Sequence, residues 1–201
     1  MSTSRRRKGG YHHGDLRSAL TQAAAALIDE RGVEGVTLRE AARRAGVSHG
    51  APYRHFSGRD ALLAELARDG FVRLVAALEE AAPRGGREVA RAYLRFALAN
   101  PQRFRLMFGL AADAEREAGW REALQRTMRA FARAYSGLAE AQDLQRAAVA
   151  AWSLVHGLAL LMLDGHVGAA DSSEAGDERF ADEVLGVLRF SLRARAPRPV
   201  V

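Results

Sequence analysis

Residues 37–56 constrain the fold more than any other stretch, because they encode two short segments that meet at a tight turn. Thr37 and Glu40 form a capping-box pattern, which predicts that a helix begins at Leu38. Leucine and alanine fall on one face of this helix, and its arginines fall outside that face. Gly46 supplies the backbone freedom with which helices often end. The first segment is therefore predicted to be a short amphipathic helix that stops at this glycine.

The second segment is expected to be a helix over about residues 49–55, capped by Ser48 and anchored in the core by Phe56. Its first residues are small or polar, which suits a helix end that enters a major groove about 12 Å wide. Pro52 lacks the N–H that would bond the carbonyl oxygen of Ser48, so a tightened or distorted first turn is expected. This layout is typical of a helix-turn-helix that reads DNA.

Three side chains of this second segment carry the chemistry of nucleic-acid recognition. Tyr53 and His55 can donate hydrogen bonds to phosphates, and Arg54 can do the same or reach a guanine edge. The alternative is a plain helical hairpin in a small bundle. Such a hairpin does not need an exposed tyrosine, arginine and histidine beside a cluster of small residues, so the DNA-binding interpretation is favoured.

The run Thr-x5-Arg-x-Ala-Gly-Val-Ser-x3-Pro-Tyr-Arg-His-Phe over residues 37–56, followed by Arg59 and Leu62-Leu63, resembles the DNA-binding domain of the tetracycline-repressor (TetR) family. Residues 11–17 also resemble the start of the first helix in one branch of that family. The resemblance covers about residues 11–75. Pro52 departs from it, since many members carry leucine or another apolar residue there. By resemblance and chemistry together, Thr37, Tyr53 and His55 are expected on phosphate, and His49, Gly50 and Ala51 at the bases. The further expected DNA contacts are Ser48, Arg54, and Arg59 at the start of the following helix.

The positive charge is concentrated near the N-terminus. Residues 1–59 carry 11 Lys/Arg and 5 Asp/Glu, a balance of +6, whereas the remaining residues carry 19 of each and balance to zero. A phosphate-binding surface needs such a patch, and its binding should weaken steeply with salt. The arginine-rich segment 5–8 could lie in the minor groove or be an idle solvated tail, and the sequence does not decide between the two.

The rest of the chain is predicted to be helical, which gives an all-α fold. It shows no strand pattern and no internal repeat. Domains are expected as a basic arm over 1–10, a three-helix helix-turn-helix domain over 11–60, a helical effector-binding and dimerisation domain over 61–195, and a loose tail over 196–201. Helices are expected over residues 14–31, 57–80, 87–99, 101–108, 116–138, 143–164 and 177–195, with a small-residue loop over 165–176.

Residues 147–163 are apolar or small except at Ser153 and His156, which is near the shortest length that can span a membrane. A histidine and a glycine at the centre and charges on both flanks favour another explanation, in which one face meets the core and the other meets a second subunit. The last two helices of each chain would then form a four-helix dimer interface. Pairing also suits DNA recognition, because one short helix reads too few bases for useful selectivity.

The run Trp152-x3-His156-Gly157-Leu158-Ala159 resembles a signature in the C-terminal domain of one TetR branch, and residues 100–108 resemble a segment found with it. This resemblance implies a dimerising domain that often encloses a small-molecule pocket. Aromatic and methionine side chains suit an apolar ligand, although at helical spacing they can equally be plain core. The candidate lining residues are Phe96, Phe104, Met107, Phe108, Trp120, Phe131, Trp152, His156 and Met162.

These observations predict a cytoplasmic, homodimeric, ligand-responsive transcriptional repressor that binds double-stranded DNA. The alternative is a DNA-binding regulator or architectural protein without an effector. Enzyme activity is not expected, since the chain offers no nucleophile–base pattern and no Gly-rich phosphate loop. The absence of cysteine excludes a Cys-ligated metal, and His156 and Asp164 stand about 12 Å apart along a helix. No metal or cofactor is therefore expected, and no membrane span.

Overall fold

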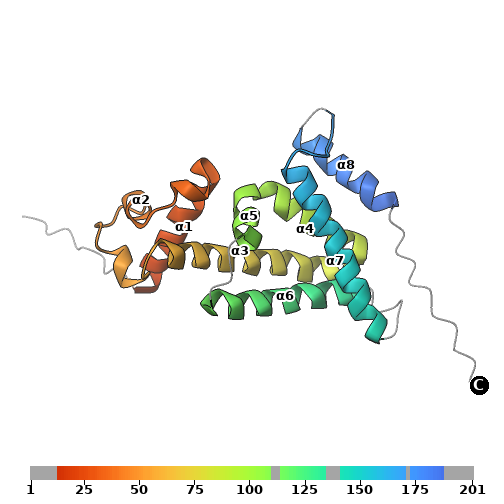
Figure 1. The fold of residues 1–201 in the computed structure, drawn as a ribbon, viewed down its shortest axis with the longest axis horizontal. Coiled ribbons are helices and arrows are strands. Elements are labelled where there is room, and N and C mark those ends of the chain that lie inside the picture. Colours follow the sequence, from red (N-terminus) through yellow and green to blue (C-terminus); the bar gives the residue numbers. More distant parts are fainter. Residues whose placement is uncertain (1–12, 110–113, 135–140, 171–172, 188–201) are drawn as a thin grey trace, which may run out of the picture. The chain divides into compact units, whose positions relative to one another are not determined.

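The structure is a computed structural model, and it describes residues 13–109, 114–134, 141–170 and 173–187. The described residues form α-helices joined by turns and short 3-10 helices, with no strand among them (Figure 1). The predicted all-α fold is confirmed. The chain divides into two compact units, the first ending at Ala67 and the second beginning at Arg68. This division falls inside one continuous helix, seven residues after the boundary expected from the sequence. The basic arm and the proline-bearing tail lie outside the described residues.

The first unit is built around α1 (His13–Arg31) and α2 (Leu38–Arg44). A 3-10 helix, η1 (Val33–Gly35), connects them, and a second one, η2 (Pro52–Arg54), follows α2 before α3 (Arg59–Ala81) begins. Apolar residues at helical spacing on each element meet in one small core. That core consists of Leu20, Ala24, Leu27, Ile28, Val36, Leu38, Ala41, Ala42, Phe56, Leu62, Leu63 and Leu66.

The second unit contains the remainder of α3 and a set of helices that pack on one another. In chain order they are η3 (Ala82–Arg84), α4 (Gly86–Ala99), α5 (Pro101–Gly109), α6 (Ala114–Ala134), α7 (Ala141–Leu163) and α8 (Glu174–Val187). Helix α7 packs against both α4 and α6, while α8 packs against α4. The bounds agree with the sequence expectations to within about two residues, with two exceptions. The predicted end of α6, at residue 138, lies outside the described residues, and α8 begins earlier, which shortens the predicted loop. Its predicted end, at residue 195, lies outside the described residues.

Gly70 allows α3 and α5 to pack closely in this unit. A Cβ atom at this position would lie 2.6 Å from the sulfur of Met107, closer than side chains tolerate. Met107 is itself buried, as is the neighbouring Phe104. One of the methionines expected to line a ligand pocket is thus committed to the contact between two helices.

Candidate nucleic-acid interface

Helix α2 is closed at both ends by the devices that the sequence indicated. The Thr37 hydroxyl accepts a hydrogen bond from the backbone N–H of Glu40 at 3.1 Å. At the other end, Gly46 has a φ of +69°. Its N–H donates to Arg43 and the N–H of Val47 donates to Ala42, the two bonds of a Schellman motif. The predicted turn is confirmed, and it fixes where the chain leaves α2.

The segment after the turn is not the α-helix that the sequence predicted. His49 and Gly50 form a turn, and η2 covers Pro52–Arg54. The Ala51 N–H donates to the carbonyl oxygen of Ser48 at 3.0 Å, and η2 begins after Ala51 without a side-chain cap, so the predicted capping role of Ser48 is wrong. The reason is Pro52, which has no N–H to give that carbonyl and whose ring hinders a regular α-turn. The expected distortion therefore extends through the whole segment.

Most of the predicted DNA contacts are on the surface of the first unit. Tyr53 is 57% exposed. Ala51, His55 and Arg59 are only half-buried. His55 is less exposed than expected, and its backbone carbonyl accepts a hydrogen bond from Arg17 at 3.1 Å. The exposed members of the predicted set are Thr37, Ser48, His49, Gly50, Tyr53 and Arg54.

Arg59 has a structural role that sequence reasoning missed. Its Nε donates to the carbonyl oxygen of Val36 at 2.9 Å, and its Nη2 donates to that of Val33 at 2.8 Å. An ion pair of 3.5 Å with Glu34 completes the contact. The guanidinium thus holds η1 and the entry to α2. Sequence spacing gives no signal for this contact, because the partners are backbone atoms more than twenty positions away.

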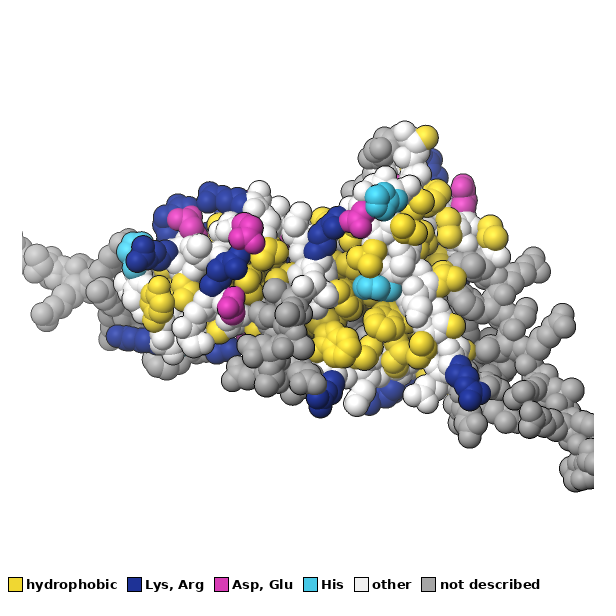
Figure 2. Space-filling view, viewed as in Figure 1, with side chains coloured by type: hydrophobic (Ala, Val, Ile, Leu, Met, Phe, Trp, Pro, Cys, Tyr) yellow, Lys and Arg dark blue, Asp and Glu magenta, His cyan; other side chains and the backbone are white. Residues whose placement is uncertain are grey.

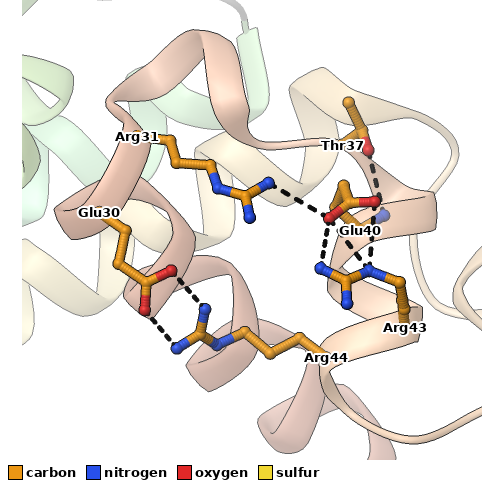
Figure 3. A network of polar contacts seen from close by, with 6 residues as sticks. All are labelled: Glu30, Arg31, Thr37, Glu40, Arg43 and Arg44. Carbon is orange, nitrogen blue, oxygen red and sulfur yellow. Dashed lines mark hydrogen bonds and ion pairs between the residues drawn. The ribbon is translucent and has the colours of Figure 1, made fainter.

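A network of ion pairs joins the end of α1 to α2 (Figure 3). The guanidinium of Arg44 makes two hydrogen bonds with the carboxylate of Glu30, at 2.6 and 2.5 Å. Glu40 accepts from Arg43 at 2.8 Å and from Arg31 at 3.5 Å. The hydrogen bond from Arg44 lowers the pKa of Glu30, and that from Arg43 lowers the pKa of Glu40. The charges of two arginines on α2 are therefore compensated locally.

In the second unit, several of the residues expected to line a ligand pocket lie together in one group of aromatic rings. The ring of His156 lies 4.6 Å from that of Phe108, 5.5 Å from that of Phe104 and 5.6 Å from that of Trp152, centroid to centroid. Tyr93, which the sequence analysis did not select, lies 6.2 Å from His156 and 6.3 Å from Phe131. We call Tyr93, Phe104, Phe108, Phe131, Trp152 and His156 the aromatic cluster.

The other predicted pocket residues lie elsewhere. Met162 lines a hollow of about 510 Å³ among α4, α5, α7 and α8, whose rim carries Arg95, Asp177 and Glu178. Trp120 is 39% exposed and Phe96 is half-buried. Within the described residues, neither of these two side chains makes a ring–ring contact with the aromatic cluster.

Two titratable groups in the aromatic cluster are shifted by burial. Desolvation lowers the pKa of His156 below its ordinary value. Desolvation also raises the pKa of the fully buried Tyr93 phenol, against a smaller opposing effect of the hydrogen bond from Trp152. Both groups are consequently neutral near pH 7, so the aromatic cluster presents no charge of its own.

Helix α7 has an apolar face that the described residues of this chain leave uncovered. Val149 is 46% exposed and Leu161 is 45% exposed. Figure 2 shows hydrophobic side chains gathered on this face of the second unit. The helical stretch 144–163 has the length and the apolar composition needed to cross a membrane. One such helix is weak evidence for a membrane span, because core helices also pass this test. Exposed apolar area of this kind commonly marks an interaction surface.

Each of the two units matches a known protein-family model. A family model described as "Tetracyclin repressor-like, C-terminal domain" matches residues 86–188, and one described as "Bacterial regulatory proteins, tetR family" matches residues 20–66. The HTH-type transcriptional repressor Rv3405c of Mycobacterium tuberculosis is 34% identical over 98 residues, 44% of this chain and 52% of that protein. The chain thus spans about half the length of the curated relatives it matches.

Solved structures resemble nearly the whole chain. A protein of unknown function from Rhodococcus sp. RHA1 is 35% identical, with a TM-score of 0.67 and coverage of 87% of this chain and 95% of that one. A bacterial regulatory protein in the tetR family from Rhodococcus RHA1 is 21% identical, with a TM-score of 0.61 and coverage of 85% and 93%. The second likeness shows the fold alone.

Proposed function

Because the chain belongs to the tetracycline-repressor (TetR) family of bacterial regulatory proteins, we propose that it is a homodimeric transcriptional repressor. It binds a palindromic operator in double-stranded DNA and leaves it when a small apolar effector occupies the second unit. The observation that carries the proposal is the exposure of Ser48, His49, Gly50, Tyr53 and Arg54 in segment 48–54, which follows the capped helix α2 within the positively charged part of the chain. The name of the Mycobacterium relative, a transcriptional repressor, agrees with this assignment.

The first unit supplies contacts both to DNA phosphates and to base edges. Thr37 at the N-terminus of α2 and Tyr53 contact phosphates, and Arg54 reaches a phosphate or a guanine edge. His49 and Gly50 are small or polar and exposed, so they can approach base edges closely. We call residues 48–54 the reading segment, and its turn and η2 make it shorter than a regular recognition helix. A short segment limits the number of bases read by one subunit and makes a second copy necessary for selectivity.

The second copy binds through α7 and α8. Val149 and Leu161 supply apolar area on α7, and Val187 on α8 is 81% exposed. Burying such a face between subunits removes it from water, which favours association. A two-fold axis then places the two reading segments about 34–36 Å apart, the spacing of successive major grooves on one face of DNA.

The effector acts by shifting a conformational equilibrium. Helix α3 contributes residues to both units, so a change in the second unit can reach the first through a continuous helix. An effector changes the fraction of DNA-binding dimers only to the extent that it binds the two dimer geometries with different affinity. The aromatic cluster, with Trp152, Phe108 and His156 only half-buried, is the place where such a ligand enters.

A second function is a DNA-binding regulator or architectural protein without an effector. The observation in its favour is the complete burial of Tyr93, Phe104 and Phe131, which is ordinary for a packed core. The two functions differ in one measurable property. Only the first predicts a ligand that releases the operator.

The test is footprinting of the purified protein on the DNA upstream of its own gene. The expected result is protection of an inverted repeat whose half-sites are about 34–36 Å apart. Scrambling one half-site should remove most of the protection, since both subunits must engage. A protein that protects no DNA even at low salt, or that binds as a monomer, would overturn the proposal.

A further inference from the structure

The aromatic cluster contains a chain of hydrogen bonds whose direction can be determined. The Nε1 atom of Trp152 lies 3.1 Å from the hydroxyl oxygen of Tyr93, and this oxygen lies 2.8 Å from Nδ1 of His156. An indole N–H can only donate, so the Tyr93 oxygen accepts from Trp152. The Tyr93 oxygen has two lone pairs and could accept from both neighbours, but its buried hydroxyl hydrogen would then have no partner among the described residues. That hydrogen is therefore directed to Nδ1 of His156.

This direction assigns the tautomer of His156. Nδ1 accepts a hydrogen bond, so it carries no proton, and the neutral ring must carry its proton on Nε2. A ring protonated at Nδ1 would need the Tyr93 oxygen to accept from both neighbours, which leaves the buried hydroxyl hydrogen without a partner among the described residues. Burial, which lowers the pKa of His156, also favours the neutral ring. His156 therefore has one N–H donor, at Nε2, on the edge opposite Tyr93.

The surroundings of that donor are aromatic and partly open. Phe104 and Tyr93 are fully buried beneath His156, whereas Phe108 and Trp152 are half-buried like His156 itself. In the part of the chain that the structure describes, the hydrogen bond of the ring runs through Nδ1 to Tyr93. His156 is thus a half-buried ring with one N–H donor, next to four other aromatic rings.

We propose that the Nε2–H of His156 anchors the effector, and that the effector is an uncharged, mainly aromatic molecule with one carbonyl-type acceptor oxygen. The oxygen would lie about 3 Å from Nε2 while the apolar body stacks on Phe108 and Trp152. This inference rests on the proposed function. A cation would meet the positive end of the N–H, and a carboxylate would have one neutral donor to offset its desolvation, so both are disfavoured.

Tyr93 and Trp152 are positioning residues in this proposal. Neither hydrogen-bonds the ligand, but together they select the tautomer that presents the donor. Replacing Tyr93 by phenylalanine removes the hydroxyl and keeps the ring that fills the core. The His156 proton can then occupy either nitrogen, so the variant should present the donor only part of the time.

The first experiment needs neither ligand nor DNA. Long-range ¹H–¹⁵N NMR of the full chain at pH 7.5 distinguishes protonated from unprotonated ring nitrogens. We expect an unprotonated Nδ1 and a protonated Nε2 for His156 in the wild type, and a mixture of tautomers in Tyr93→Phe. A wild-type ring with its proton mainly on Nδ1, or an imidazolium, would overturn the proposal.

The second experiment uses three probes with one body: 2-acetylnaphthalene, 2-isopropylnaphthalene and 2-naphthoate. Their dissociation constants are measured by calorimetry for the wild type, for His156→Phe and for His166→Phe, a matched control at an exposed histidine. The preference for the acetyl over the isopropyl probe should fall roughly 2- to 12-fold in His156→Phe, the range of one hydrogen bond. Tyr93→Phe should lose part of the preference, and the control should lose none.

The outcomes separate this inference from the proposed function. An unchanged preference in His156→Phe, tightest binding by 2-naphthoate, or no binding of either neutral probe would overturn the inference. Operator binding is measured on the same samples. If the acetyl probe binds as expected and the operator stays bound, the inferred role of His156 in ligand binding is retained. The proposal that such a ligand releases the operator is then wrong. Circular dichroism confirms that each variant is folded, and the tautomer measurement supplies a test if His156→Phe is not.

Discussion

Arg59 at the start of α3 donates a hydrogen bond from Nε to the carbonyl oxygen of Val36, directly before the cap of α2. A second bond, from Nη2 to Val33, extends the contact to η1. One guanidinium thereby joins α3 to η1 and to the residue that follows η1. This contact holds the backbone directly before Thr37, so it supports the start of α2 together with the local cap.

Arg59→Ala should therefore destabilise the first unit by about 1–3 kcal/mol, since two backbone carbonyls lose charge-assisted partners. Urea unfolding followed by circular dichroism measures the loss. Arg59→Lys should recover only part of it, because an ammonium cannot reproduce the planar two-bond geometry. Arg39→Ala, on the exposed side of α2, is the matched control and should leave stability unchanged. An Arg59→Ala protein with the wild-type midpoint would contradict this role.

Tyr53→Phe and Arg54→Ala should weaken operator binding without affecting folding or dimerisation. Both side chains are exposed, and in the proposal they contact DNA rather than the core. Loss of one hydroxyl contact should cost about 2- to 12-fold in affinity. Loss of Arg54 should also reduce the slope of log affinity against log salt by about one if it binds a phosphate. Unchanged affinity for both variants would mean that the reading segment is misplaced.

The sequence predicted this site in its outline and missed what depends on distant contacts. Local chemistry was sufficient for the Thr37 cap and the Gly46 turn, because each is made by neighbours within a few residues. Pro52 was expected to distort the first turn of an α-helix. In the structure no α-helix forms over this segment, which consists of a turn and η2. The roles of Arg59 and Tyr93 could not be seen, because their partners lie 23 and 63 positions away along the chain.

The basic segment 5–8, which lies outside the described residues, gives a prediction about salt. If these four cations bind phosphates, their replacement by alanine should reduce the slope of log affinity against log salt by up to about 0.9 per cation. Electrophoretic shift assays over a series of salt concentrations measure the slope. An unaltered slope would favour an idle solvated arm.

Leu161→Glu should convert the protein to a monomer and abolish tight operator binding. The substitution places a charge on the apolar face of α7 that we assign to the partner subunit, and burying that charge is unfavourable. Sedimentation velocity gives the oligomeric state. Val72→Glu is the matched control, because Val72 is similarly exposed at 52% but lies on α3. A Leu161→Glu protein that stays dimeric would place the interface elsewhere.

His156 gives a prediction about pH. Its pKa is lowered by burial in the folded protein, whereas the unfolded chain has an ordinary value near 6.5. Below that pH the unfolded state binds more protons than the folded state, so stability falls as pH falls from 6.5 toward the folded pKa. His156→Phe removes this contribution, so its urea midpoint should change less than that of the wild type between pH 7.5 and 5.5.

Titration of the carboxylates affects stability at a lower pH than titration of His156 does. The hydrogen bond from Arg126 lowers the pKa of Glu79 in the folded protein, so the stability that Glu79 contributes is lost only as pH falls below its ordinary value of 4.5. Loss of stability in that acid range should be the same in wild type and His156→Phe. His166→Phe controls for removal of an exposed histidine and should follow the wild type throughout. If His156→Phe and wild type lose stability equally between pH 7.5 and 5.5, the neutral ring of His156 contributes nothing to the fold, and the chain of donors from Trp152 through Tyr93 does not fix its protonation.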